Sequence, residues 1–173
     1  MTYKFKIALA GWLIVALVVA LASIFEEPAL AQNREPSPGD YFFLEFLAGV
    51  GGAFVGGISG GILVQKMVTS KEVEEEEAAV MTLVGVGAGL AAGATMGVVV
   101  AGSLLGVNGN LLFAPLGAIL GVVNAFGIIY WQEVQEGREF SPILRAALVL
   151  GAPAFGAAAG YNIGAKMGSR SRT

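Results

Sequence analysis

Apolar residues occur along this chain in long unbroken stretches rather than in the short alternating runs of half-buried strands. Four such stretches cover residues 41–64, 78–105, 111–131 and 143–163. Each holds at least the roughly 18 apolar residues that make a candidate transmembrane helix. The connections between them are short, which makes sequence neighbours antiparallel neighbours in space. The pattern predicts an all-α fold, a membrane four-helix bundle of two antiparallel hairpins.

The first 31 residues have the three parts of a secretory signal peptide. Lys4 and Lys6 supply the positive end, residues 7–25 are apolar, and residues 29–31 (ALA) fit the small-x-small cleavage rule. The alternative is an uncleaved N-terminal transmembrane helix, because a bilayer-spanning helix needs only about 20 apolar residues. The sequence EEP before the ALA site favours cleavage. A polar linker (32–40), a glycine-rich membrane domain (41–168) and a basic tail (169–173) complete the predicted organisation.

Small residues recur every four positions within the apolar stretches. Residues four apart lie on one side of a helix, so each helix would present a groove free of bulky side chains. In lipid, helices associate through close backbone approach, which small-xxx-small spacing permits. The first stretch carries two neighbouring rows: Gly49, Ala53, Gly57, Gly61 and Gly52, Gly56, Gly60. The residues that we predict to pack helices are Gly57, Gly61, Gly85, Gly89, Gly93, Gly97, Gly117, Gly121, Gly156, Gly160 and Gly164.

The segment GVGAGLAAGATMG, residues 85–97, admits two other interpretations. Residues 87–92 fit the G-x-G-x-x-A variant of the dinucleotide fingerprint, which requires a preceding strand and an acidic residue about 20 positions later. Apolar residues flank the segment on both sides, and residues 105–110 contain no Asp or Glu. A flexible linker would not carry the leucine, valine and methionine side chains of this segment. We therefore interpret it as a membrane helix with a glycine face.

Composition narrows the chemistry further. Hydrophobic residues make up 55% of the 173 residues and charged residues 13%, against about 25% charged in an ordinary soluble domain. Because the chain has no cysteine and no histidine, it has no disulfides, thiolate chemistry or Cys/His zinc sites. A net charge of −3 without a basic stripe gives no sign of a nucleic-acid partner. We predict no catalytic, cofactor-binding or metal-binding residues and no small-molecule substrate, hence a protein that is not an enzyme.

Three polar residues within the apolar stretches are candidates for an intramembrane function, because ionisable and polar groups are costly in lipid. Glu45 lies near the start of its stretch, either as an interfacial carboxylate favoured by the helix dipole or as a group that handles ions or protons. Arg145 also lies near an end, from which its side chain can reach the interface. Asn124 lies in the middle of its stretch, where we expect a hydrogen bond to another helix.

The ending PAFGAAAGYNIGAKMGSR, together with the signal segment and the Gly-xxx-Gly stretches, resembles small uncharacterised bacterial glycine-zipper envelope proteins. That resemblance implies an envelope membrane protein and transfers no activity. The four helices and their spacing are also similar to the mitochondrial Tim17/Tim22/Tim23 translocase group. The polar Arg/Asp signature that the group carries between helices is not found in this sequence.

These observations predict a non-enzymatic, multi-pass protein of the bacterial cell envelope, located in the inner (cytoplasmic) membrane. We expect a structural or assembly role, in which the chain packs through glycine-zipper helices. Its expected partners are the lipid bilayer and either further copies of itself or other membrane proteins. The alternative is a small oligomeric channel, or another permeability or translocation component, in which several copies surround a pore.

Overall fold

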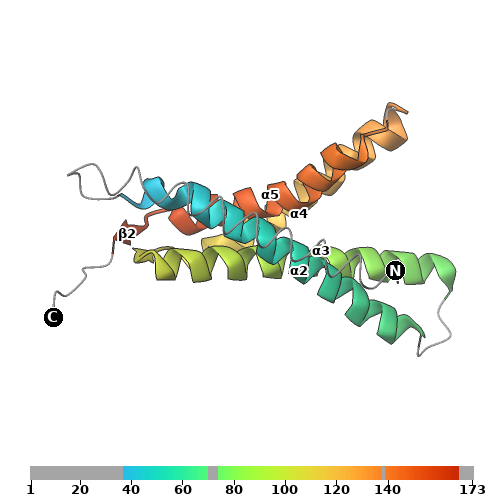
Figure 1. Cartoon of the computed structure of the whole chain (residues 1–173). Coiled ribbons are helices and arrows are strands. Elements are labelled where there is room, and N and C mark those ends of the chain that lie inside the picture. Colours follow the sequence, from blue (N-terminus) through green and yellow to red (C-terminus); the bar gives the residue numbers. More distant parts are fainter. Residues whose placement is uncertain (1–36, 70–73, 138, 168–173) are drawn as a thin grey trace, which may run out of the picture.

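The structure is a computed structural model that describes residues 37–69, 74–137 and 139–167. Four long helices dominate it, and each is long and apolar enough to cross a membrane (Figure 1). At this level the predicted all-α fold is confirmed. The predicted signal segment and the basic tail lie outside the described residues. In chain order the elements are η1 (a 3-10 turn, Pro38–Tyr41), α2 (Phe42–Thr69), α3 (Glu75–Leu104), β1 (Val107–Asn108), α4 (Phe113–Tyr130), η2 (a π-helical turn, Trp131–Gln135), α5 (Pro142–Asn162) and β2 (Lys166–Met167).

The helices begin where polar side chains satisfy or complement the free N–H groups of a first turn. Three exposed glutamates, residues 75–77, occupy the first turn of α3, where the helix dipole favours negative charge. The Oδ1 of Asn110 accepts hydrogen bonds from the backbone N–H groups of Leu112 and Phe113 at the start of α4. Ser141 caps α5 in the same way, and its hydroxyl accepts from the N–H of Leu144.

The four helices form two hairpins, with α2 packed along α3 and α4 packed along α5. Figure 1 shows that the hairpins lie together at the end that carries β2 and diverge toward their own connections. We call the first of these the closed end, where α2 and α4 begin and α3 and α5 end. The opposite end, where α2 and α4 end and α3 and α5 begin, is the open end.

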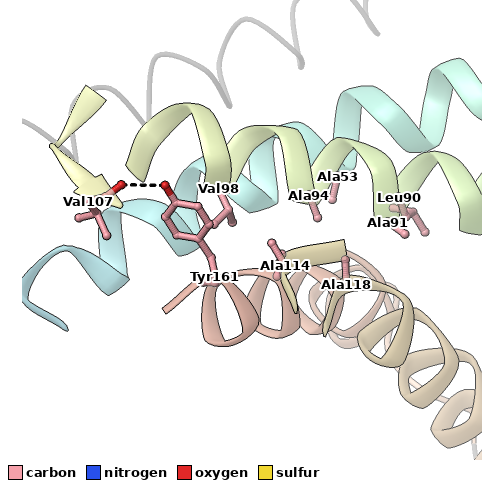
Figure 2. Packing of buried hydrophobic residues seen from close by; sticks show 11 residues of the cluster. Ala53, Leu90, Ala91, Ala94, Val98, Val107, Ala114, Ala118 and Tyr161 are labelled. Atoms are coloured by element: carbon pink, nitrogen blue, oxygen red, sulfur yellow. Dashed lines mark hydrogen bonds between the residues drawn. The ribbon is translucent and has the colours of Figure 1, made fainter. Parts of the chain in front are cut away.

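The buried core is built from small side chains, and the large apolar side chains point outward. Leu63, Val84 and Leu120 are each at least 60% exposed. A domain that folds in water buries such residues, whereas a protein in lipid can place them against acyl chains and use small residues to bring its helices close. Figure 2 shows the centre of this packing. Among the described residues, nine of the thirteen buried hydrophobic residues are alanines: Ala53, Leu90, Ala91, Ala94, Val98, Val107, Ala114, Ala118, Ala125, Ala154, Ala157, Ala158 and Tyr161.

A short antiparallel ladder joins the two hairpins at the closed end. Strand β1 follows α3, and strand β2 follows α5, so the ladder ties together segments about 60 residues apart. Its two pairs are Val107 with Met167 and Asn108 with Lys166. Two-residue strands leave no alternating pattern in a sequence, and neither strand was predicted.

The structure corrects one predicted packing residue. Helix α5 ends at Asn162, so Gly164 lies beyond the helix. Its φ of +69° is in the left-handed region that favours glycine, and a Cβ built on it would meet nothing within 4 Å. The prediction that Gly164 packs helices is therefore wrong. The four-residue spacing in the sequence continues to Gly164, although the left-handed turn there follows the end of the helix.

Candidate functional site

Three glycines of α2 face three glycines of α3 with nothing between the two backbones. A Cβ built on Gly52 or Gly56 would overlap the carbonyl oxygen of Gly93 or Gly89, respectively. Each step of four residues along α2 is matched by a step of four back along α3, as in an antiparallel pair. We call this surface the α2–α3 glycine face; its facing residues are Ala48 with Gly97, Gly52 with Gly93, Gly56 with Gly89, and Gly60 with Gly85.

The second hairpin is built in the same way. A Cβ built on Gly117 would overlap the carbonyl oxygen of Gly156, and one built on Gly156 would overlap that of Gly117. Pro153 lies inside α5 at this contact, and its Cα would be 2.7 Å from a Cβ on Gly121. We call this surface the α4–α5 glycine face; its facing residues are Phe113 with Gly160, Gly117 with Gly156, and Gly121 with Ala152.

Two of the predicted packing glycines in α2 lie beside the glycine face rather than on it. A Cβ on Gly57 would lie 3.0 Å from Cδ2 of Leu90, and one on Gly61 would lie 3.1 Å from Cγ2 of Val86. These positions leave room for side chains of α3 instead of bringing the backbones together. Gly49, in the same row, leaves room for Val98 of α3 and Ala154 of α5.

Glu45 is the buried acidic residue of the described chain, with an exposed fraction of 0%. It lies in the first turn of α2, as expected for an interfacial carboxylate, but the side chain points into the protein. Its Oε2 accepts a hydrogen bond from Nδ2 of Asn162, at the last position of α5. The contact connects the two hairpins at the closed end. Sequence reasoning missed Asn162 because the two residues lie 117 positions apart.

Tyr161 is the largest fully buried side chain in the described part of the protein, and it also connects the hairpins (Figure 2). Its hydroxyl donates to the carbonyl oxygen of Val107 at 2.8 Å, and its own carbonyl accepts from the N–H of Asn110 at 2.7 Å. The ring lies over Gly102 and Gly109, where a Cβ would overlap it. These two glycines therefore make the space that the tyrosine occupies.

Asn124 does not make the predicted hydrogen bond to another helix. Its Nδ2 donates to the carbonyl oxygen of Leu120, one turn back in α4. The side chain is exposed and lines a groove on the outside of α4 and α5. A polar side chain can satisfy its own helix in this way, so position within an apolar stretch does not by itself indicate an interhelical bond.

Arg145 lies at the open end, where its guanidinium pairs with Glu133 at 2.6 Å. The same carboxylate oxygen accepts from the backbone N–H of Phe140 at 3.3 Å. The pair therefore links η2, which follows α4, to the first turn of α5. Glu45, Asn124 and Arg145 do not come together into one site: they occupy the closed end, an outer groove and the open end.

Removing the guanidinium by Arg145→Ala is expected to lower the free energy of unfolding by less than about 1 kcal/mol, because exposed ion pairs contribute little. The side chains of the pair are 49% and 20% exposed. Chemical unfolding in detergent at low and high salt measures the effect, which should shrink as salt screens the pair. A loss above about 2 kcal/mol, unchanged by salt, would show that Arg145 supports the core instead.

The four helices together have the length and composition of a multi-pass membrane protein. The sequence matches no protein-family model, no curated protein and no solved structure. Within the described residues, no group of three or more Asp, Glu, His or Cys side chains could hold a metal ion. The candidate functional surfaces described above are the two glycine faces, the polar contacts of the closed end and the outer grooves of the hairpins.

Proposed function

We propose that this chain is a non-enzymatic integral membrane protein with a structural, self-assembling role, built from two glycine-zipper hairpins in a bacterial envelope membrane. The observation that carries the proposal is the pair of glycine faces, where carbonyl oxygens lie where side chains would otherwise be. Contacts of this kind are typical of helices that associate in lipid, where burial from water supplies no driving force. The small-residue core and the outward-facing leucines and valines support the same interpretation.

Both glycine faces are used within the chain, so self-assembly requires other surfaces. The outside of α4 and α5 offers an apolar groove of about 780 Å³, lined by Leu120, Asn124, Phe155 and others. The outside of α2 and α3 offers a second groove of about 500 Å³, lined by Val55, Met96 and Leu104 among others. Both are lined in part by glycine, which permits close approach of a further helix. We propose that a second copy of the chain packs against one of these grooves.

Photocrosslinking of purified protein in liposomes tests this proposal. A photoreactive amino acid replaces Leu120 in one groove or Met96 in the other, which are 62% and 64% exposed. The control is Ile143, which is 83% exposed at the start of α5 and lines neither groove. We expect a product of twice the chain mass from one groove position and lipid adducts alone from Ile143. Lipid adducts alone from all three positions, at low protein-to-lipid ratio, would reject the self-assembling role.

The alternative channel interpretation depends on a carboxylate that faces a water-filled path between copies. Glu45 is the candidate for that role, and it is fully buried between α2 and α5 of one chain. This burial favours the structural role over the channel.

A further inference from the structure

The contact between Glu45 and Asn162 has an unusual balance of donors and acceptors. The amide nitrogen of Asn162 donates to Oε2 of Glu45 and to the carbonyl oxygen of Ala158. Both amide hydrogens are therefore used, and the two acceptors fix which end of the amide faces Glu45. Oε1 of Glu45 and Oδ1 of Asn162 are left buried with no hydrogen-bond donor among the described residues. Two acceptor oxygens at one contact thus lack a positive partner.

Among the described residues, no side chain forms an ion pair with the carboxylate of Glu45. The ion pair found in the described part of the chain, Arg145 with Glu133, lies at the open end, far from Glu45 at the closed end. An isolated carboxylate is expensive to bury away from water, and a single hydrogen bond from a neutral amide does not offset that cost. Something that carries positive charge is needed where Oε1 and Oδ1 lie.

We propose that Glu45 and Asn162 form a binding site for one monovalent cation, either a proton or an alkali metal ion, at the contact between α2 and α5. One positive charge neutralises the one carboxylate, whereas a divalent ion would leave a net charge buried. A proton on Oε1 could donate to a neighbouring oxygen, and an alkali ion would take both oxygens as ligands. Either way, the cation neutralises the buried carboxylate at Oε1, which the described residues leave without a donor.

The exposure of Asn162 indicates the side from which a cation would reach this site. Glu45 is fully buried, but Asn162 is partly exposed at the closed end of the bundle, so the approach is from that side. The bound cation would join the first helix of one hairpin to the last helix of the other. Its binding should therefore stabilise the association of the two hairpins, because a ligand held by the folded state stabilises that state.

Other titratable groups at the closed end have to be distinguished from Glu45. On η1, which precedes α2, these are Asp40 and Tyr41; Asp40 accepts from the N–H of Ser37. On α5 it is Tyr161, whose hydroxyl donates to Val107, and on β2 it is Lys166. The acidic residues of α3 lie in its first turn, at the open end.

The test is thermal unfolding of the full-length protein in detergent, across pH 5 to 9 and from zero to high NaCl, with choline chloride holding ionic strength constant. If the cation is a proton, Tm is highest at low pH and falls as pH rises, without response to Na⁺. The sign follows because the folded protein would bind a proton at Glu45, whereas the unfolded chain, in which Glu45 is exposed to water, would release it. If the cation is an alkali ion, Tm rises with Na⁺ or K⁺ at fixed pH. A wild-type Tm that responds to neither would overturn the proposal.

Variants assign the response to the site. Glu45→Gln replaces the carboxylate with a neutral amide, whose NH2 group supplies a donor in place of the cation. The variant should therefore fold and lose the pH or Na⁺ response. Glu133→Gln, at the exposed carboxylate of the open end, is the matched control and should keep the wild-type response. Persistence of the response in Glu45→Gln, or its loss in Glu133→Gln, would contradict the assignment. In the alkali-ion case, Asn162→Ala should weaken the response to Na⁺ by removing Oδ1.

Discussion

Gly52→Ala is expected to lower the free energy of unfolding by about 3 kcal/mol, the upper end of the usual cost of overpacking. The new methyl group would overlap the carbonyl oxygen and carbon of Gly93, and a backbone atom cannot move aside as a flexible side chain can. The hairpin has to separate to make room, which weakens every neighbouring contact of the α2–α3 glycine face. The measurement is chemical or thermal unfolding in detergent, followed by circular dichroism.

The neighbouring residue supplies the matched control. A Cβ on Gly51 would meet nothing within 4 Å, so Gly51→Ala should be neutral or slightly stabilising, since alanine is the better helix former. Gly93→Leu, on the opposite side of the face, should abolish the folded state altogether. Equal effects of the alanine replacements at positions 51 and 52, or wild-type migration and stability of Gly93→Leu, would refute glycine packing of the hairpin.

Tyr161→Ala is the second change with a large expected effect, a loss of about 3–5 kcal/mol, as for other buried aromatic residues replaced by alanine. The ring fills the space between Gly102 and Gly109 and holds the closed end together. Tyr161→Phe keeps the ring and removes the hydrogen bond to Val107, so it should cost only about 1 kcal/mol.

The comparison of these two variants separates packing from hydrogen bonding. Unfolding in detergent gives both values, and crosslinking between introduced cysteines at Val107 and Met167 reports whether β1 and β2 stay paired. Equal losses for alanine and phenylalanine would mean that the hydroxyl, and not the ring, holds the hairpins together.

The helices were predictable because their signal is long and local. The apolar stretches predicted at 78–105 and 143–163 differ from α3 (Glu75–Leu104) and α5 (Pro142–Asn162) by three residues or fewer at any end. The prediction was weaker at the end of α2, which continues to Thr69, because Gln65 and Lys66 close an apolar stretch without ending a helix. Helix formation depends on backbone geometry, and polar residues in a last turn are compatible with it.

The orientation of α2 was harder to predict, because its two rows of small residues are equally spaced. They lie about 60° apart around the helix, from three steps of 3.6 residues per turn. The row through Gly52 faces the backbone of α3, whereas the row through Gly57 faces side chains such as Leu90. Only the shape of the partner helix decides between the rows, and a single stretch of sequence does not contain that shape.

The polar contacts of the closed end were not predictable for a related reason. Glu45 was recognised as a candidate, but its partner Asn162 lies at the far end of the chain. Tyr161 and Val107 are 54 positions apart. Each contact depends on how the two hairpins pack against each other, and the residue spacing within one helix does not determine that packing.

The four-residue spacing of the glycine face has a consequence for how the hairpin is held in register. A slide of α3 along α2 by four residues, about 6 Å, would again align four small pairs: Ala48 with Ala101, Gly52 with Gly97, Gly56 with Gly93, and Gly60 with Gly89. The row of glycines therefore permits close approach at more than one axial offset. The offset that the structure adopts is selected by contacts outside the row, such as Gly49 beneath Val98 and Gly57 beneath Leu90. Weakening those contacts would allow α3 to slide along α2 while the two rows of small residues still packed closely.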